Sequence, residues 1–153
     1  MKKVFVLAMS SLLLFSCNNT SEKQTEQKQE AKTGEQEHNH NESSEMIELN
    51  MGQKWLVNNE MKPFVTNGEQ LVALYIKNNK TDYKFLANQL KEENSQLIKS
   101  CTMKGKSHDE LHKWLHPHLE LVKSLENETD PAIAAKTILE IQNSYKTYHS
   151  YFE

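Results

Sequence analysis

Residues 130–152 decide the fold, and they read DPAIAAKTILEIQNSYKTYHSYF. Asp130 can cap a helix, and Pro131 suits the first helical position because proline lacks the N–H that finds no partner there. Apolar residues then recur every three or four positions, which is the period of one helix face. The stretch therefore predicts a long amphipathic helix whose buried stripe is Ala134, Ile138, Ile141, Tyr145, Tyr148 and Phe152.

Two earlier segments show the same helical spacing. The first covers about 53–78 and contains Pro63, which should kink the helix or mark its true start. The second follows Thr81 or Asp82 as its cap. Gly105 suits the position where this second helix would terminate, because glycine tolerates a left-handed backbone.

A third segment begins at Ser107, and its apolar face runs from Leu111 to Leu125. Ser107 and Glu110 have the S-x-x-E spacing of a capping box, and Pro117 predicts a kink further along. Four amphipathic helices with short connections indicate an all-α, up-down-up-down four-helix bundle over residues 46–153.

The N-terminus, MKKVFVLAMSSLLLFSC, is typical of an export signal, with two lysines followed by a short apolar run. Leu14 to Cys17 resembles the lipobox of bacterial lipoproteins. That resemblance implies removal of residues 1–16, lipidation of Cys17 and a place in the cell envelope, on the outer membrane or facing the periplasm. The alternative is an ordinary secretory signal with a chance cysteine.

Residues 17–45 follow as the lipidated cysteine and a polar tether. From residue 18 onward the segment has no aromatic or large aliphatic side chain, so it cannot bury enough surface to offset the entropy of ordering and should be disordered. The formal net charge of −3 and the lack of a basic patch argue against a nucleic-acid partner. The sequence indicates the membrane as a partner and leaves protein partners open.

The stretch SCTMKGKSHDELHKWLHPH, residues 100–118, is the richest in metal-ligating side chains. If Cys17 is lipidated, Cys101 has no disulfide partner in the chain, and an odd thiol outside the cytoplasm suggests an intermolecular bridge, a reactive group or a metal ligand. His108 and His112 are four residues apart, which places two imidazoles on one side of a helix.

Residues equally far from a turn lie at the same level on neighbouring antiparallel helices, and this rule places further metal-ligating side chains near residues 100–118. Counting outward from the expected turns places Met61 close to the level of Cys101. Cys101 falls level with Asp109, which falls level with His149. We therefore expect one end of the bundle to gather Cys101, Met103, His108, His112, Met61 and His149, with His116 pointing away and His118 facing the core deeper in the bundle.

Thiolate and thioether ligands select Cu(I), and imidazole serves copper, zinc and haem iron. The set predicts a Cu(I) site; a Zn(II) site of Cys101, His108, His112 and a fourth ligand is chemically nearly as good. The structural alternative is that Cys101 is a small core residue and Met61 a core filler.

Two resemblances add to these expectations. The segment from Cys101 to His112, C-T-M-K-G-x-x-H-D-x-L-H, resembles one carried by small, largely uncharacterised lipoproteins of the Bacteroidota, which share the order of lipobox, tether and helical domain. The domain is also similar in architecture to four-helix-bundle cytochromes of the b and c-prime types. That resemblance implies haem b held by Met61 and His149, whereas the lack of CxxCH excludes covalent haem.

The sequence contains no catalytic triad order, nucleotide-binding loop or HExxH motif, so we expect a binding protein and not an enzyme. The leading hypothesis is an envelope lipoprotein that binds a soft transition metal, most simply copper, for buffering or delivery. A haem b bundle and a structural or interaction lipoprotein without metal are the alternatives.

Overall fold

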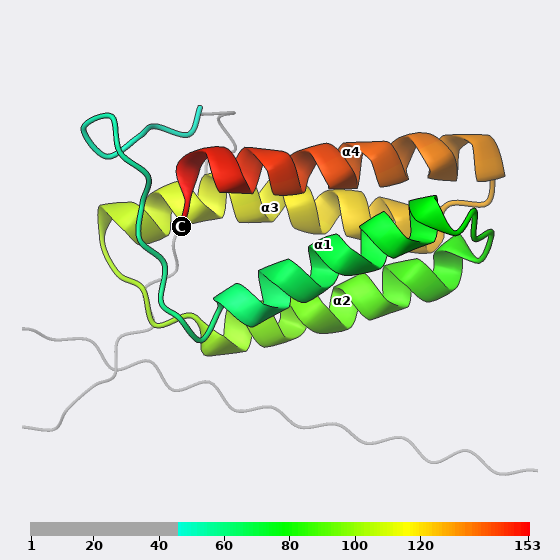
Figure 1. Cartoon of the computed structure of the whole chain (residues 1–153), viewed down its shortest axis with the longest axis horizontal. Coiled ribbons are helices and arrows are strands. Elements are labelled where there is room, and N and C mark those ends of the chain that lie inside the picture. Colours follow the sequence, from blue (N-terminus) through cyan, green and yellow to red (C-terminus); the bar gives the residue numbers. More distant parts are fainter. Residues whose placement is uncertain (1–45) are drawn as a thin grey trace, which may run out of the picture. The chain divides into compact units, whose positions relative to one another are not determined.

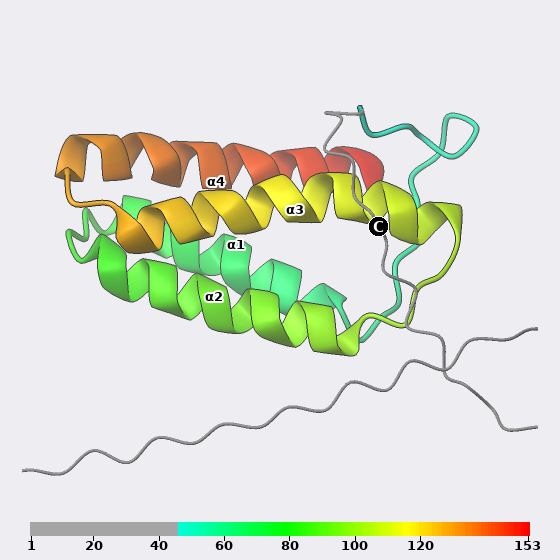
Figure 2. The same cartoon turned by 180° about the vertical axis from the view of Figure 1, so that it is seen from behind.

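The computed structural model describes residues 46–153, and in this range the chain is an all-α bundle of four helices. The helices are α1 (Lys62–Lys77), α2 (Tyr83–Ser100), α3 (Lys106–Asn127) and α4 (Pro131–Tyr151). Each packs against the next along the chain, and α4 packs back on α1. Figures 1 and 2 show the up-down-up-down order with short connections, which confirms the expected fold class.

Two helix starts are where the sequence predicts them. The Asp82 carboxylate accepts a hydrogen bond from the backbone N–H of Phe85 at 2.9 Å, and Asp130 accepts one from Ala132 at 2.7 Å. Both are side-chain caps that satisfy an otherwise unpaired N–H of the first turn. Pro63 lies in the first turn of α1. It therefore marks the true start of this helix, one of the two outcomes expected, and the start at residue 53 is wrong.

The start of α3 differs from the expected capping box. Gly105 is the N-cap, with φ of 65°, and it is not the end of α2, which stops at Ser100. The Ser107 hydroxyl donates to the carbonyl of Lys104, so it caps nothing. Pro117 lies within α3, and the helix runs through it to Asn127.

Glu110 is buried and has partners that its spacing from Ser107 does not reveal. Its carboxylate accepts the backbone N–H of Glu48 at 2.8 Å and the ammonium of Lys113 at 2.9 Å. The capping box fails because Glu110 faces a chain segment from 62 positions earlier instead of its own helix start.

The segment before α1 runs alongside the end of α4. The N–H of Trp55 donates to the carbonyl of Tyr151 at 2.7 Å, and the N–H of Glu153 donates back to Trp55 at 3.0 Å. The N–H of Val57 also donates to Glu153, at 3.0 Å. The side chains of Trp55 and Phe152 are buried. Figure 1 shows the backbone of this segment passing the C-terminal end of α4 at one end of the bundle.

The core follows the predicted stripes, most completely in α4, where all six expected residues are buried. The helical spacing of the second segment also predicts a buried face that includes Ile98, but this residue of α2 is 48% exposed. Within residues 46–153, none of the helices has the length and apolar character needed to cross a membrane. The predicted signal (residues 1–16), lipidated Cys17 and tether (residues 17–45) lie outside the described residues.

Candidate functional site

The sulfur side chains of the predicted site pack against the core. Cys101 is the C-cap of α2 and is half-buried, and Met103 in the following connection is also partly buried. Met61, just before α1, is 1% exposed and belongs to the core itself. These placements correspond to the structural alternative that the sequence left open for Cys101 and Met61.

His149 lies at the predicted height but faces a different neighbour. The indole N–H of Trp114 donates to the carbonyl of Ser144 at 2.8 Å, so α3 and α4 have the register that was counted from the sequence. The His149 ring, however, is turned to α1, where its Nε2 lies 2.9 Å from a carboxylate oxygen of Glu69. Spacing along the chain gives the height of a side chain reliably, but its direction depends on how each helix is rotated.

The imidazoles of α3 form a row along one side of the helix. His108 and His112 approach through their Nε2 atoms at 3.1 Å, and the Nδ1 of His112 lies 3.0 Å from the Nε2 of His116. His116 is exposed and points away from the core, as expected, yet its contact with His112 was missed. The spacing of four residues, repeated twice, is the signal that could have revealed it.

The row does not converge on one point, because His112 uses a different nitrogen toward each neighbour. In agreement, residues 46–153 contain no group of three or more His, Cys, Asp or Glu side chains arranged to hold a metal ion. What the row offers is a pair of neighbouring imidazoles, His108 and His112, and a metal ion bound by both would replace the hydrogen bond between their Nε2 atoms.

The separation of these two nitrogens is compatible with more than one metal geometry. For metal–nitrogen bonds of ~2.0–2.1 Å, donors 3.1 Å apart subtend an angle of roughly 95–102° at the metal. This angle lies between the right angle of tetragonal Cu(II) or Ni(II) and the tetrahedral angle of Zn(II). The separation therefore suits copper and zinc alike, with the other positions of the ion filled by other ligands or water.

His118 is the fourth imidazole of α3 and lies in the core, as the sequence predicts. It is fully buried, its Nδ1 lies 3.0 Å from the hydroxyl of Ser144, and its ring stacks on Trp114 with centroids 4.9 Å apart. Burial lowers the pKa of His118 to about 4, so the ring is neutral at neutral pH. His118 thus belongs to the packed interior and not to the surface row.

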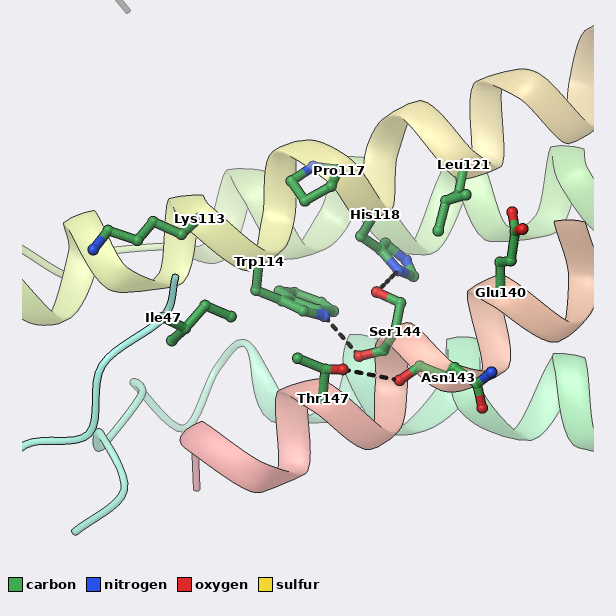
Figure 3. Close-up of a pocket in the computed structure, with 10 residues that line it drawn as sticks. All are labelled: Ile47, Lys113, Trp114, Pro117, His118, Leu121, Glu140, Asn143, Ser144 and Thr147. Carbon is green, nitrogen blue, oxygen red and sulfur yellow. Dashed lines mark hydrogen bonds between the residues drawn. The ribbon is translucent and has the colours of Figure 1, made fainter. Parts of the chain in front are cut away.

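A pocket of about 330 Å³ is lined by residues of α3 and α4, His118 among them (Figure 3). Trp114, Pro117 and Leu121 line it from α3, and Ile47 reaches it from the segment before α1. Figure 3 shows Ser144 of α4 directed at His118. The pocket has an apolar lining with a polar rim and no cluster of ligating side chains.

Comparison with known proteins adds no family: no family model, curated protein or solved structure matches this chain.

Proposed function

We propose that this chain is a lipid-anchored protein of the bacterial cell envelope whose helical domain binds copper for buffering or delivery. The observation that carries the proposal is the 3.1 Å approach of the Nε2 atoms of His108 and His112, which brings two imidazoles within reach of one ion. The proposed role is buffering or delivery, because two ligands on a helix surface leave a metal ion open to exchange.

The position of His108 and His112 on α3 influences how tightly the pair would bind a metal ion. His108 is in the first turn of α3, where the positive end of the helix dipole disfavours a cation. The carboxylate of Asp109 in the same turn offsets part of this effect. Both imidazoles are partly exposed, so the metal does not need to be buried in the core. These features favour a moderate, exchangeable affinity, which suits buffering and delivery.

The sulfur atoms of Cys101 and Met103 are the proposed ligands for the reduced ion, Cu(I). Cys101 and Met103 flank the connection that leads into α3, and thiolate and thioether prefer Cu(I) to Cu(II). Both side chains pack against the core, so their participation requires them to turn outward. Zinc remains the competing metal for the imidazole pair.

The haem b hypothesis gains no support from these placements. Met61 is a core side chain, whereas His149 is half exposed and bonded to Glu69. The two proposed haem ligands therefore face different surroundings, and haem binding would require the core around Met61 to repack.

The test is a Cu(II) titration of the purified full-length chain, followed by electron paramagnetic resonance of the bound ion. His108→Ala with His112→Ala should weaken binding by at least about tenfold and remove nitrogen hyperfine structure, since even the loss of an outer-shell partner commonly costs that much. His149→Ala is the matched control, because it removes an exposed imidazole from the same domain. Equal copper affinity in all three proteins would reject the site.

The anchor has its own test, since it is independent of the metal. Replacing Cys17 with alanine should abolish labelling by fatty acid and release the protein from the membrane fraction. An unlabelled native chain that is secreted freely would support the ordinary secretory signal instead.

A further inference from the structure

Three polar atoms in the interior of the bundle have no hydrogen-bond partner among residues 46–153. They are the Nε2 of His118, the hydroxyl of Tyr145 and the Nδ2 of Asn94. The three residues are 0%, 2% and 6% exposed, and they come from α3, α4 and α2 respectively. An unpaired polar group in the interior costs roughly 1–3 kcal/mol, and native proteins seldom leave such groups unpaired.

The packing brings these groups toward one level of the bundle. The rings of His118 and Tyr145 meet edge to face with centroids 4.8 Å apart, and the Tyr145 hydroxyl extends to the backbone of Gly68 on α1. Asn94 follows Glu93, which accepts a hydrogen bond at 3.3 Å from Asn67, the residue before Gly68. The three residues therefore add a set of polar groups from α2, α3 and α4 to an otherwise apolar core, which we call the polar layer.

The charge state of these three side chains determines whether the polar layer binds an ion or a neutral molecule. Burial lowers the pKa of His118 to about 4, and it raises the pKa of Tyr145 well above its usual value, with Glu93 and Glu69 adding to the increase. Both rings are therefore neutral at neutral pH, and the Asn94 amide carries no charge. A layer without charge offers nothing to offset the desolvation of an ion, so it favours a neutral molecule.

The donor and acceptor roles of the three unpaired atoms restrict the choice of ligand further. The Tyr145 hydroxyl and the Asn94 amide both donate, while the Nε2 of His118 donates or accepts according to the proton that Nδ1 shares with Ser144. A water molecule has two donors and two acceptors, and buried waters typically bond to polar groups that lack protein partners. We infer that the centre of this bundle is an internal water-binding site, in which ordered water bonds to His118, Tyr145 and Asn94.

Whether Tyr145→Phe raises or lowers the stability of the fold tests this inference. Tyr145→Phe removes the hydroxyl and keeps the ring. If water bonds to that hydroxyl, the variant should lower the folding equilibrium constant of the full-length chain about fivefold to tenfold, measured by chemical denaturation at neutral pH. Tyr148→Phe is the matched control, since Tyr148 is a buried tyrosine of the same helix whose hydroxyl is not one of the enclosed unpaired atoms.

An increase in stability in Tyr145→Phe would overturn the inference, because removing a truly unpaired hydroxyl relieves its desolvation cost. A high-resolution crystal structure provides an independent readout. Electron density for water within hydrogen-bonding distance of these atoms supports the site. A fully packed interior with the three atoms in contact only with carbon overturns it.

Discussion

The hydroxyl of Tyr145 lies where a side chain on Gly68 would begin. A Cβ at position 68 would overlap this hydroxyl and also come within 3.0 Å of the ring carbon that carries it. Glycine is therefore required in the middle of α1 by the tyrosine of α4, although glycine weakens a helix interior by roughly 1 kcal/mol relative to alanine. This contact fixes how closely the two helices approach.

Gly68→Ala should destabilise the domain by about 1–3 kcal/mol despite the better helix propensity of alanine, because the added methyl group overpacks the core. The measurement is chemical denaturation of the single and double variants. In the double variant with Tyr145→Phe, the total loss should be smaller than the sum of the two single losses, since part of the clash is removed. Gln70→Ala, an exposed change on the same helix, serves as the control, and additive losses in the cycle would contradict the proposed contact.

Acid should destabilise the domain through His118. The folded pKa of about 4 lies below the ordinary value of 6.5, so the unfolded chain binds a proton first as the pH falls. The stabilisation is complete above pH 6.5 and is lost progressively between pH 6.5 and 4, with a total of about 3 kcal/mol. His118→Gln should flatten the pH dependence of the unfolding free energy in this window, and an unchanged slope would refute the assignment.

Glu110 should stabilise the segment before α1. Burial alone would raise the pKa of its carboxyl, but the N–H of Glu48 together with Lys113 and Lys106 lowers it below the ordinary value of 4.5. Its contribution is therefore present above that value and is lost as the pH falls through the lowered folded pKa. Glu110→Ala should cost about 1–3 kcal/mol and speed hydrogen exchange at the amide of Glu48.

The matched control for Glu110 is Glu120→Ala. Glu120 also pairs with a lysine three residues later on α3, but its side chain is 69% exposed. An exposed pair contributes little, so this variant should change the free energy of unfolding by less than about 1 kcal/mol. Equal losses in the two variants would mean that burial of Glu110 adds nothing.

The histidine row predicts a graded loss of copper binding. His112→Ala should have a large effect on Cu(II) affinity, because it removes one of the two proposed ligands, and His116→Ala a smaller one, because its ring contacts the other nitrogen of His112. Cys101→Ser should leave Cu(II) affinity unchanged and weaken only Cu(I) binding under reducing conditions, since thiolate is a soft ligand. Isothermal titration with each oxidation state measures both effects, and a Cu(II) affinity that depends on Cys101 would contradict the imidazole pair.

Local signals in the sequence were sufficient for much of the fold. Asp82 and the Asp130–Pro131 pair act within one turn of their own helix, so their spacing determines their role. Gly105 was recognised as a residue that tolerates a left-handed backbone, but not as the cap of α3. Glu110 could not be interpreted from spacing at all, because its partner Glu48 is distant in sequence.

In the candidate site, too, some features follow from local sequence and others depend on the packing of the whole domain. Heights along the bundle were predictable, since helix rise and turn positions set them, and the bond from Trp114 to Ser144 has the expected register. The direction of His149 was not, because helix rotation depends on the whole core. The pairing of Tyr145 with Gly68 was likewise hidden, since no local pattern links a missing side chain to a distant ring.

The backbone bonds of Trp55 and Val57 to the last residues of the chain determine how the domain responds to mechanical load. A pull applied from the N-terminal side reaches these bonds before it reaches Lys62, so the force passes to the end of α4 as well as to α1. The pulling force is thus shared between the first and last helices, α1 and α4. Tension would have to break the backbone bonds of Trp55 and Val57 before it could separate α1 from the core.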